Sequence, residues 1–552
     1  MTNLTFSVIV PVYDPNTVHI QECLSSVFKQ SLSSEFWELI LVHDFDVHPI
    51  SDFIDCSILE RSNVKFFDSP KHLGISLATN KGASLAEGEY LIFLDQDDLL
   101  DCTALGELKK FIDDSINRPQ LLYSDYRLIS ESGNLIDNIE TPDFSPVRLL
   151  GLMYPVHLKI VTKKLWQQLG GYNSDLDGSQ DHDLYLRASC LTEIVHVPKV
   201  MYSWRASEKS SQANPIAKPL APIKTRMSVE THLENQGYKY RLKLANPHPA
   251  IYQVDILSKR SPSLSIVITT RFALIDGEIA LQTLLRSIEE SKLNNEVEII
   301  CVVSPYYESA KNQLKTKLTI KWVRYHQEEF NYSKAVNVGV SASINENILI
   351  LNDDMEFVSK DWIDTLNGFL GIPGTGIVGA KLLFPDGNIQ HAGIGITELG
   401  HCYHILYNTN GLIGTLGEGM INHEVDAVTG AFMGVTRENW ELFGGLPETF
   451  AKNYNDIAFC LKAWNLGKSV IQLNSIQLIH HESLSRTPTR TVQEQADFNN
   501  YLRKYPKTGR YTLSPENLHQ EKISLRGGLV SLIVDSIRCR GIVGAIRNYF
   551  SR

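Results

Sequence analysis

Hydrophobic and polar positions alternate along the chain in blocks that predict strands and amphipathic helices in turn. Residues 6–14, FSVIVPVYD, form a short apolar run that predicts a buried strand. Apolar residues then recur at spacings of three and four across residues 20–28, which predicts a helix with one buried face. A second apolar run, WELILVHD at 37–44, predicts the next strand. Strands that alternate with helices indicate a mostly parallel sheet covered by helices on both faces.

This pattern occurs twice in the chain, which predicts two domains of the same α/β class. Residues 264–271 and 296–303 predict two strands with a helical segment between them, and the offset from the first copy is 258 residues, from Ser7 to Ser265. A stretch rich in Pro, Lys and Ser separates the copies. We therefore expect a first domain at residues 1–255 and a second at 256–510, since a chain of 552 residues is too long for one core.

Each copy also contains a short apolar strand that ends in acidic residues. YLIFLDQDD spans 90–98 and NILILNDD spans 347–354, and Asp97 corresponds to Asp354 at an offset of 257 residues. Ligands bind at the carboxyl ends of strands in such sheets, and carboxylates there suit a hard divalent cation such as Mg²⁺ or Mn²⁺, which would neutralise a diphosphate leaving group. The alternative is a strand-to-loop turn, where aspartate is common. Because the feature occurs twice at a matching offset, we favour the cation site.

Two further aspartates open helical segments that correspond between the copies. Asp181 in SQDHDLYLRA and Asp456 in YNDIAFCLKA align at an offset of 275 residues, which predicts an insertion in the second copy near residues 400–414. An acidic residue in a first helical turn is often a cap. A carboxylate at a helix start on the ligand side can also act as general base on an incoming hydroxyl, and the two roles are compatible.

Composition narrows the class of protein. The chain is 43% hydrophobic and 21% charged, with a formal net charge of −11, which argues against a nucleic-acid partner. Its eight cysteines show no CxxC spacing and predict neither a zinc ribbon nor a disulfide framework. The N-terminus does not have the pattern of a signal peptide, and no apolar run approaches the ~20 residues of a membrane span. We therefore expect a cytoplasmic protein.

The last segment differs from both copies. Residues 521–552 carry six basic and two acidic residues, and apolar residues recur there at helical spacing. The plain interpretation is a helix packed on the body of the protein or on a partner. The alternative is an amphipathic tail at residues 511–552 that rests on anionic lipid, which would place the protein peripherally at the inner face of the cytoplasmic membrane.

The order of these motifs resembles the family 2 glycosyltransferases with a GT-A fold. The first copy carries the resemblance in SVIVPVYD, ELILVHD and HLGISLATNKGASLAEGEYLIFLDQDD. The second copy, in FNYSKAVNVGVSAS, GIVGAKLLFPDGNIQHAGIGI, VDAVTGAFMGV and LIHHES, is similar to the second module of tandem enzymes that build bacterial surface polysaccharides such as O-antigens and rhamnose-rich chains. The resemblance covers about residues 5–205 and 263–486. It implies two GT-A domains and an inverting, metal-dependent transfer of a hexosyl or rhamnosyl group from a nucleotide-sugar to a growing, lipid-linked glycan.

The resemblance also implies roles for individual residues. The catalytic bases would be Asp181 and Asp456. Contacts with the nucleotide-sugar would come from Pro11, Tyr13, Asp44, Asp95, Asn352 and Asp353. The divalent metal would be held by Asp95, Asp97, Asp354 and His480.

The two copies depart from the family pattern in different places. The first has Ser203 in MYSWR, where related modules usually carry a histidine. The second lacks the Pro-Val-Tyr stretch in its first strand and has Ser304 and Pro305 where an acidic residue is expected. Two interpretations stay open: two activities in one chain, or one catalytic module and one degenerate module that binds the glycan. A nucleotidyltransferase is disfavoured, because no glycine-rich basic loop follows either first strand.

Overall fold

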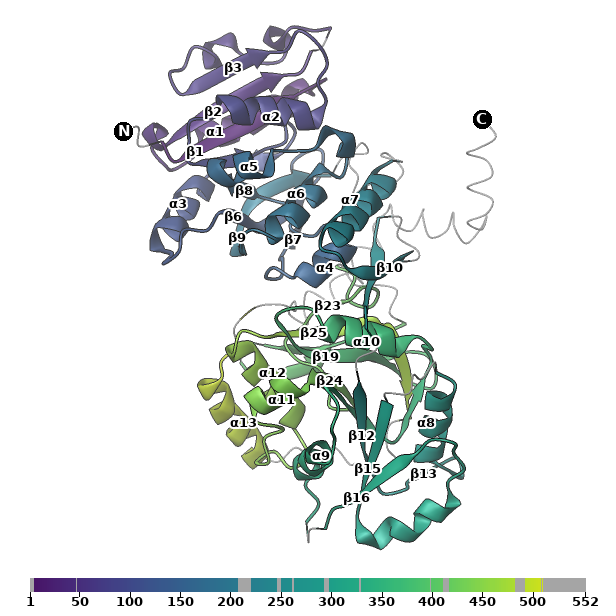
Figure 1. Cartoon of the computed structure of the whole chain (residues 1–552). Helices are drawn as coiled ribbons and strands as arrows, with labels where there is room; N and C mark the ends of the chain where they lie inside the picture. Colours follow the sequence, from purple (N-terminus) through teal and green to yellow (C-terminus); the bar gives the residue numbers. More distant parts are fainter. Residues whose placement is uncertain are drawn as a thin grey trace, which may run out of the picture.

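Two α/β domains follow one another along the chain and are joined by a helix and a hairpin (Figure 1). The computed structural model describes residues 4–45, 47–206, 220–245, 250–260, 263–291, 297–326, 329–397, 399–410, 416–481, 492–507 and 509. The predicted fold class, α/β domains in tandem, is confirmed. The predicted amphipathic tail at 511–552 lies outside the described residues. Within the described ranges, no helix combines the length and apolarity that a bilayer span requires.

The first domain is built on a nine-stranded sheet with the order β3-β2-β1-β4-β8-β6-β9-β5, and β7 pairs with β6. Its strands are β1 (Phe6–Val12), β2 (Trp37–His43), β3 (Val64–Asp68), β4 (Tyr90–Phe93), β5 (Leu99–Leu100), β6 (Leu121–Ile129), β7 (Leu135–Ile139), β8 (Lys159–Thr162) and β9 (Ile194–Arg205). Its helices are α1 (Thr17–Phe28), α2 (Ile75–Leu85), α3 (Ala104–Asp114), α4 (Pro146–Gly151), α5 (Lys163–Leu169) and α6 (Gln180–Ser189).

The most apolar strands lie in the middle of this sheet because both of their faces are covered. Every residue of β2 is buried, and β1 is buried except at Pro11. In register, Ile9 lies opposite Ile40 of β2 and opposite Phe93 of β4, and both pairings are parallel. Asn16 caps α1 by accepting two backbone N–H groups of its first turn. The carboxyl ends of β1, β2 and β4 therefore point to one edge of the sheet, where α1 begins.

The second domain has a ten-stranded sheet with the order β16-β15-β12-β17-β24-β19-β25-β18, in which β20 pairs with β19 and β23 with β25. The strands of this sheet are β12 (Leu264–Thr270), β15 (Val297–Val303), β16 (Ile320–Arg324), β17 (Asn347–Asn352), β18 (Met355–Phe357), β19 (Thr375–Leu383), β20 (Ile389–His391), β23 (His423–Glu424), β24 (Phe432–Thr436) and β25 (Ser469–His480). Two small pairs are β13 (Leu274–Ile275) with β14 (Glu278–Ile279), and β21 (Ile394–Ile396) with β22 (Cys402–His404). The helices are α8 (Ala280–Glu289), α9 (Tyr332–Ser341), α10 (Trp362–Leu370), α11 (Arg437–Phe443), α12 (Asn455–Asn465) and α13 (Val492–Lys504).

The two large sheets have the same strand order, so the internal repeat read from the sequence is present in the topology. Along the order from β3 to β5 in the first domain and from β16 to β18 in the second, each strand of one sheet has a counterpart at the same position in the other sheet. The first four strands of each order are parallel. Antiparallel pairing begins where β4 meets β8 and where β17 meets β24. The acidic residues of each domain therefore follow the last strand of its parallel half.

The connection between the domains consists of α7 (Ala221–Asn235), β10 (Lys239–Leu244) and β11 (Tyr252–Leu257). The β10–β11 hairpin packs against α10 of the second domain at Gly368, where a Cβ atom would lie 2.1 Å from the carbonyl oxygen of Ile256. Only glycine permits so close an approach. The domain boundary that we expect between residues 255 and 256 falls within β11.

Candidate active sites

The strand tip of the first domain is tied to the loop after β1. Asp95, Gln96 and Asp97 follow β4 and are partly buried. The Gln96 side chain accepts from the backbone N–H of Tyr13 at 2.8 Å and donates to the Tyr13 carbonyl at 2.8 Å. The Tyr13 ring packs against His72, with the ring centroids 4.5 Å apart. The structure therefore brings Tyr13 and the acidic tip together.

Asp44 lies at the same edge but is engaged with the neighbouring loop. Its carboxylate accepts from the backbone N–H groups of Leu73 at 2.5 Å and Gly74 at 2.9 Å, and it lies 3.0 Å from Nδ1 of His72. Its side chain is only 3% exposed. Asp44 thus shapes the loop that begins α2, and a nucleotide would reach it only through its remaining lone pairs.

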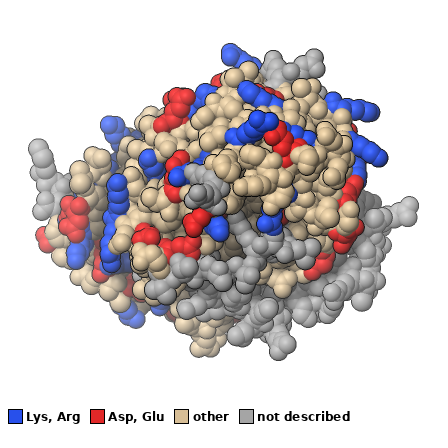
Figure 2. All heavy atoms as spheres, turned by 90° about the horizontal axis from the view of Figure 1, so that it is seen from below, with Lys and Arg blue, Asp and Glu red and all other residues tan. Residues whose placement is uncertain are grey.

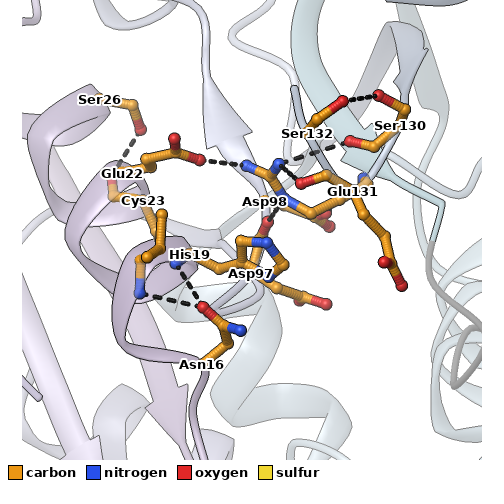
Figure 3. A network of polar contacts seen from close by, with 12 residues as sticks. Asn16, His19, Glu22, Cys23, Ser26, Asp97, Asp98, Ser130, Glu131 and Ser132 are labelled. Atoms are coloured by element: carbon orange, nitrogen blue, oxygen red, sulfur yellow. Dashed lines mark hydrogen bonds and ion pairs between the residues drawn. The ribbon is translucent and has the colours of Figure 1, made fainter. Parts of the chain in front are cut away.

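A buried arginine fixes the backbone of the acidic tip, of which Asp97 and Asp98 are labelled in Figure 3. Arg205 is 1% exposed; its Nε donates to the Asp97 carbonyl at 2.8 Å, and its guanidinium pairs with Glu22 at 2.7 Å. Asp98 accepts from the Tyr202 hydroxyl at 2.6 Å and from the Arg205 backbone N–H at 2.7 Å. Burial, and then repulsion from Asp95 and Asp97, raises the pKa of Asp98 well above its usual range. The tip is therefore a site of concentrated negative charge that a bound cation would relieve.

The candidate base of the first domain carries a partner that the sequence reading missed. Asp181 lies in the first turn of α6, and Lys159 Nζ lies 2.9 Å from its Oδ2. The Tyr172 hydroxyl donates a short hydrogen bond to Oδ1. Burial by itself would lower the pKa of Lys159, but Asp181 and Asp95 hold it above its ordinary value. A lysine within the otherwise apolar segment HLKIV is the signal that could have pointed to this pair.

The second domain has no lysine at the corresponding place. In the first domain, Ile9 of β1 lies opposite Phe93, which lies opposite Lys159 of β8. In the second domain, Val267 of β12 lies opposite Ile350, which lies opposite Met433 of β24. A thioether side chain therefore replaces the ammonium group in the repeated framework.

The acidic tip of the second domain places two carboxylates in different surroundings. Asp353 accepts from the Thr270 hydroxyl at 2.6 Å, and burial together with the charge of Asp354 raises its pKa to about 6. Asp354 Oδ1 lies 3.2 Å from Nε2 of His480, the last residue of β25. Burial opposes ionisation of Asp354, yet His480 holds the pKa of this carboxyl below its usual value. Nδ1 of His480 contacts Gln390 Oε1 at 2.5 Å, which orients the imidazole ring.

The candidate base of the second domain is held by backbone groups. Asp456 lies in the first turn of α12 and accepts from the N–H of Gly430 at 2.9 Å and of Ile457 at 2.9 Å. The Tyr332 hydroxyl lies 3.1 Å from the Gly430 carbonyl and 3.3 Å from Asn352 Oδ1. Tyr332, which the sequence reading did not single out, therefore connects the loop that holds Asp456 with the acidic tip.

A divalent cation fits these groups as a partial ligand set. No group of three or more His, Cys, Asp or Glu side chains that could hold a metal is present in the ranges that the structure describes. The buried Asp354 Oδ1 makes no hydrogen bond of good geometry, so it retains a lone pair beside His480. In the first domain, Figure 3 shows the Asp97 carboxylate without a hydrogen bond to the residues drawn. Two protein ligands suffice for Mg²⁺ or Mn²⁺ when substrate phosphates supply the others.

Comparison with known proteins finds similarity in part of the first domain and over most of the chain. Residues 7–118 match the family model Glycosyl transferase family 2. The chain is 31% identical to the uncharacterized protein y4gI of Sinorhizobium fredii, over 91% of this chain and 56% of that protein. It is 29% identical to the O-antigen biosynthesis protein RfbC of Myxococcus xanthus, over 87% of this chain and 37% of that protein. The chain thus spans about half or less of the length of these relatives. A solved structure of S. aureus TarS 1–349 in complex with UDP-GlcNAc aligns with a TM-score of 0.36 and 20% identity, over 42% of this chain and 67% of that chain.

Proposed function

We propose that the chain transfers a sugar from a nucleotide-sugar to a growing surface polysaccharide, with inversion. The match of residues 7–118 to the family model Glycosyl transferase family 2 supports this proposal. The observation that carries this proposal is the repeated strand order, in which an acidic strand tip is followed by a helix-initiating aspartate in both domains. The O-antigen role in the name of the Myxococcus xanthus relative supports a polysaccharide product.

In the second domain, Asp456 is the base that takes the proton from the acceptor hydroxyl. Its two backbone hydrogen bonds fix the carboxylate while leaving lone pairs for the incoming proton. Asp354 and His480 would hold Mg²⁺ or Mn²⁺, and the chemistry that such an ion would supply is neutralisation of the charge on the departing diphosphate. Asn352 and Asp353 lie beside these groups and contact the nucleotide-sugar.

In the first domain, the corresponding roles fall to Asp181 as base and to Asp95 and Asp97 as metal ligands. Pro11, Tyr13, Asp44 and Asp95 contact the nucleotide-sugar. The Tyr13–Gln96 hydrogen bonds support this arrangement, because they hold the nucleoside side of the site against the acidic tip. We also propose that the first glycosyltransferase domain spans residues 1–255 and the second spans residues 256–510.

A second candidate function for the first domain is glycan binding without transfer, and one observation favours it. The Asp181 carboxylate is paired with the Lys159 ammonium at 2.9 Å and also accepts from the Tyr172 hydroxyl, so its negative charge already has a cationic partner. Asp456 has no such ammonium partner among the described residues. In this case the second domain performs a single transfer and the first domain binds the growing glycan.

The acceptor that we propose is a lipid-linked glycan, with a hexosyl or rhamnosyl group as the transferred sugar. The protein would then work in the cytoplasm, peripherally at the inner face of the membrane, with the basic residues of 521–552 contacting anionic lipid. Sedimentation with vesicles that contain anionic lipid, compared with neutral vesicles, tests that contact.

Separate substitutions in the two tips test the function. We expect Asp354→Ala to abolish transfer from a panel of nucleotide-sugars to a lipid-linked acceptor, while the exposed Asp114→Ala is the matched control that leaves it intact. Asp97→Ala abolishes a second, distinguishable transfer if both domains are catalytic, and only weakens acceptor binding if the first domain is a binding module. Full transfer in both Asp97→Ala and Asp354→Ala would refute the proposed chemistry.

A further inference from the structure

A pocket of about 540 Å³ lies where the β10–β11 hairpin meets the second domain. Its wall combines hairpin residues, the segment that starts α10, and the carboxyl-terminal ends of β19 and β25. Its volume lies in the range of small-molecule sites. None of the residues assigned above to the donor, the metal or the base lines it, so it is separate from the candidate transfer centre.

Lys381 is a partly buried cation in this wall, and no carboxylate of the described residues pairs with it. It lies on β19 opposite Gln477 of β25, is partly buried, and donates from Nζ to the Gly419 carbonyl at 3.0 Å. Burial, with no acidic group to oppose it, lowers the pKa of Lys381 to about 8. A buried charge without a counter-ion is unfavourable, and an anionic ligand would supply that counter-ion.

The other charged residues of the wall leave a positive excess. Arg241 is balanced by Asp255 at 2.9 Å and by Asp361 at 3.4 Å. Lys243 and Lys360 add two further cations, and the nearest acidic oxygen to Lys360 is that of Glu290 at 3.8 Å, which does not line the pocket. Figure 2 shows acidic and basic side chains interspersed on the face seen from below, so this face carries no broad positive field.

The pocket and the candidate site of the second domain share strands β20 and β25. Ile389 of β20 lines the pocket, and the next residue, Gln390, contacts Nδ1 of His480 at 2.5 Å. His480 in turn lies 3.2 Å from Asp354. Strand β25 contributes Gln477 to the pocket and His480 to the site. Side chains alternate along a strand, so Gln477 and His480 point to opposite faces of the sheet, and the pocket lies on the face opposite the candidate transfer centre.

We propose that this pocket binds a phosphorylated saccharide through Lys381, at a site apart from the candidate transfer centre. Lysine is a common point-charge partner of phosphate, and the pocket volume exceeds that of a phosphate alone, so it has room for an attached sugar. The choice of a saccharide rests on the proposed function, whereas the binding of a phosphate group by Lys381 does not.

Acetylation of lysines in the full chain at pH 8, read by mass spectrometry, tests the proposal. With EDTA present, glucose 1-phosphate at about ten times its Kd should slow acetylation of Lys381 about tenfold, since only the free fraction reacts. Exposed Lys110 on α3 is the internal control and should react at an unchanged rate. Glucose should give no protection. Absence of protection by glucose 1-phosphate, or protection by glucuronate alone, would overturn the proposal.

Variants separate this pocket from the donor site. Calorimetry should show that Lys381→Met loses glucose 1-phosphate binding while Lys381→Arg retains it, with unchanged circular dichroism in both. Protection of Lys381 should persist in Asp354→Asn, because that change affects the candidate transfer centre and not the pocket. Loss of protection in Asp354→Asn would place the ligand at the donor site and would refute the pocket assignment. Failure of transfer with intact Lys381 protection would count against the proposed function alone.

Discussion

The ion pair between Lys159 and Asp181 gives the sharpest stability prediction for the first domain. The two groups lie 2.9 Å apart, and their side chains are 8% and 23% exposed. Removing one member of a buried pair costs about 3–5 kcal/mol, because the remaining charge stays buried without a partner. Asp181 keeps some solvent contact and its hydrogen bond from Tyr172, so we expect Lys159→Met to cost about 3 kcal/mol, at the low end of that range.

A double-mutant cycle measures the pair itself. Asp181→Asn should destabilise the first domain by a similar amount, because it leaves the Lys159 ammonium unpaired. The double variant should be less destabilised than the sum of the single changes by about 2 kcal/mol. Hydrogen–deuterium exchange of the full chain in urea, followed on peptides from β8 and α6, reports the opening of this domain without interference from the second. Additive effects within about 0.5 kcal/mol would show that the two groups do not stabilise each other.

Two further predictions concern the second tip and the contact between domains. The folded-state pKa of Asp353, about 6, lies above its ordinary value of 3.8, so the contribution of this group to stability is complete below pH 4 and is lost as the pH rises through 6. Thermal melts in EDTA should therefore show that Asp353→Asn is as stable as the parent near pH 4 and about 2–3 kcal/mol more stable than the parent at pH 8. A stability difference that does not change with pH would contradict this prediction. Arg148 of α4 is 1% exposed, donates to the Leu416 carbonyl at 3.0 Å and lies 3.4 Å from Glu418. Arg148→Met should therefore lower the free energy of unfolding by about 3 kcal/mol and hasten proteolysis between the domains. An unchanged cleavage rate would show that this contact does not hold the domains together.

Sequence alone determined the local character of each element and the existence of the repeat. Apolar runs of strand length and apolar residues at helical spacing are properties of short segments, so they could be read without knowing any distant contact. The same reading located both acidic tips and both helix-initiating aspartates. The direction of β8 and β24 could not be read in this way, because a fully buried strand has the same apolar pattern whether it is parallel or antiparallel to its neighbour.

Only the tertiary structure decided which groups meet. Lys159 reaches Asp181 because β8 returns antiparallel beside β4, and Tyr332 links Asn352 to the loop before β24 because α9 lies over the same sheet edge. Lys381 acquires its pocket only when the hairpin from the domain connection packs on the second sheet. Each of these environments depends on contacts between segments far apart in the chain, and the energy of a charged group depends on what surrounds it in space, which a one-dimensional pattern does not contain.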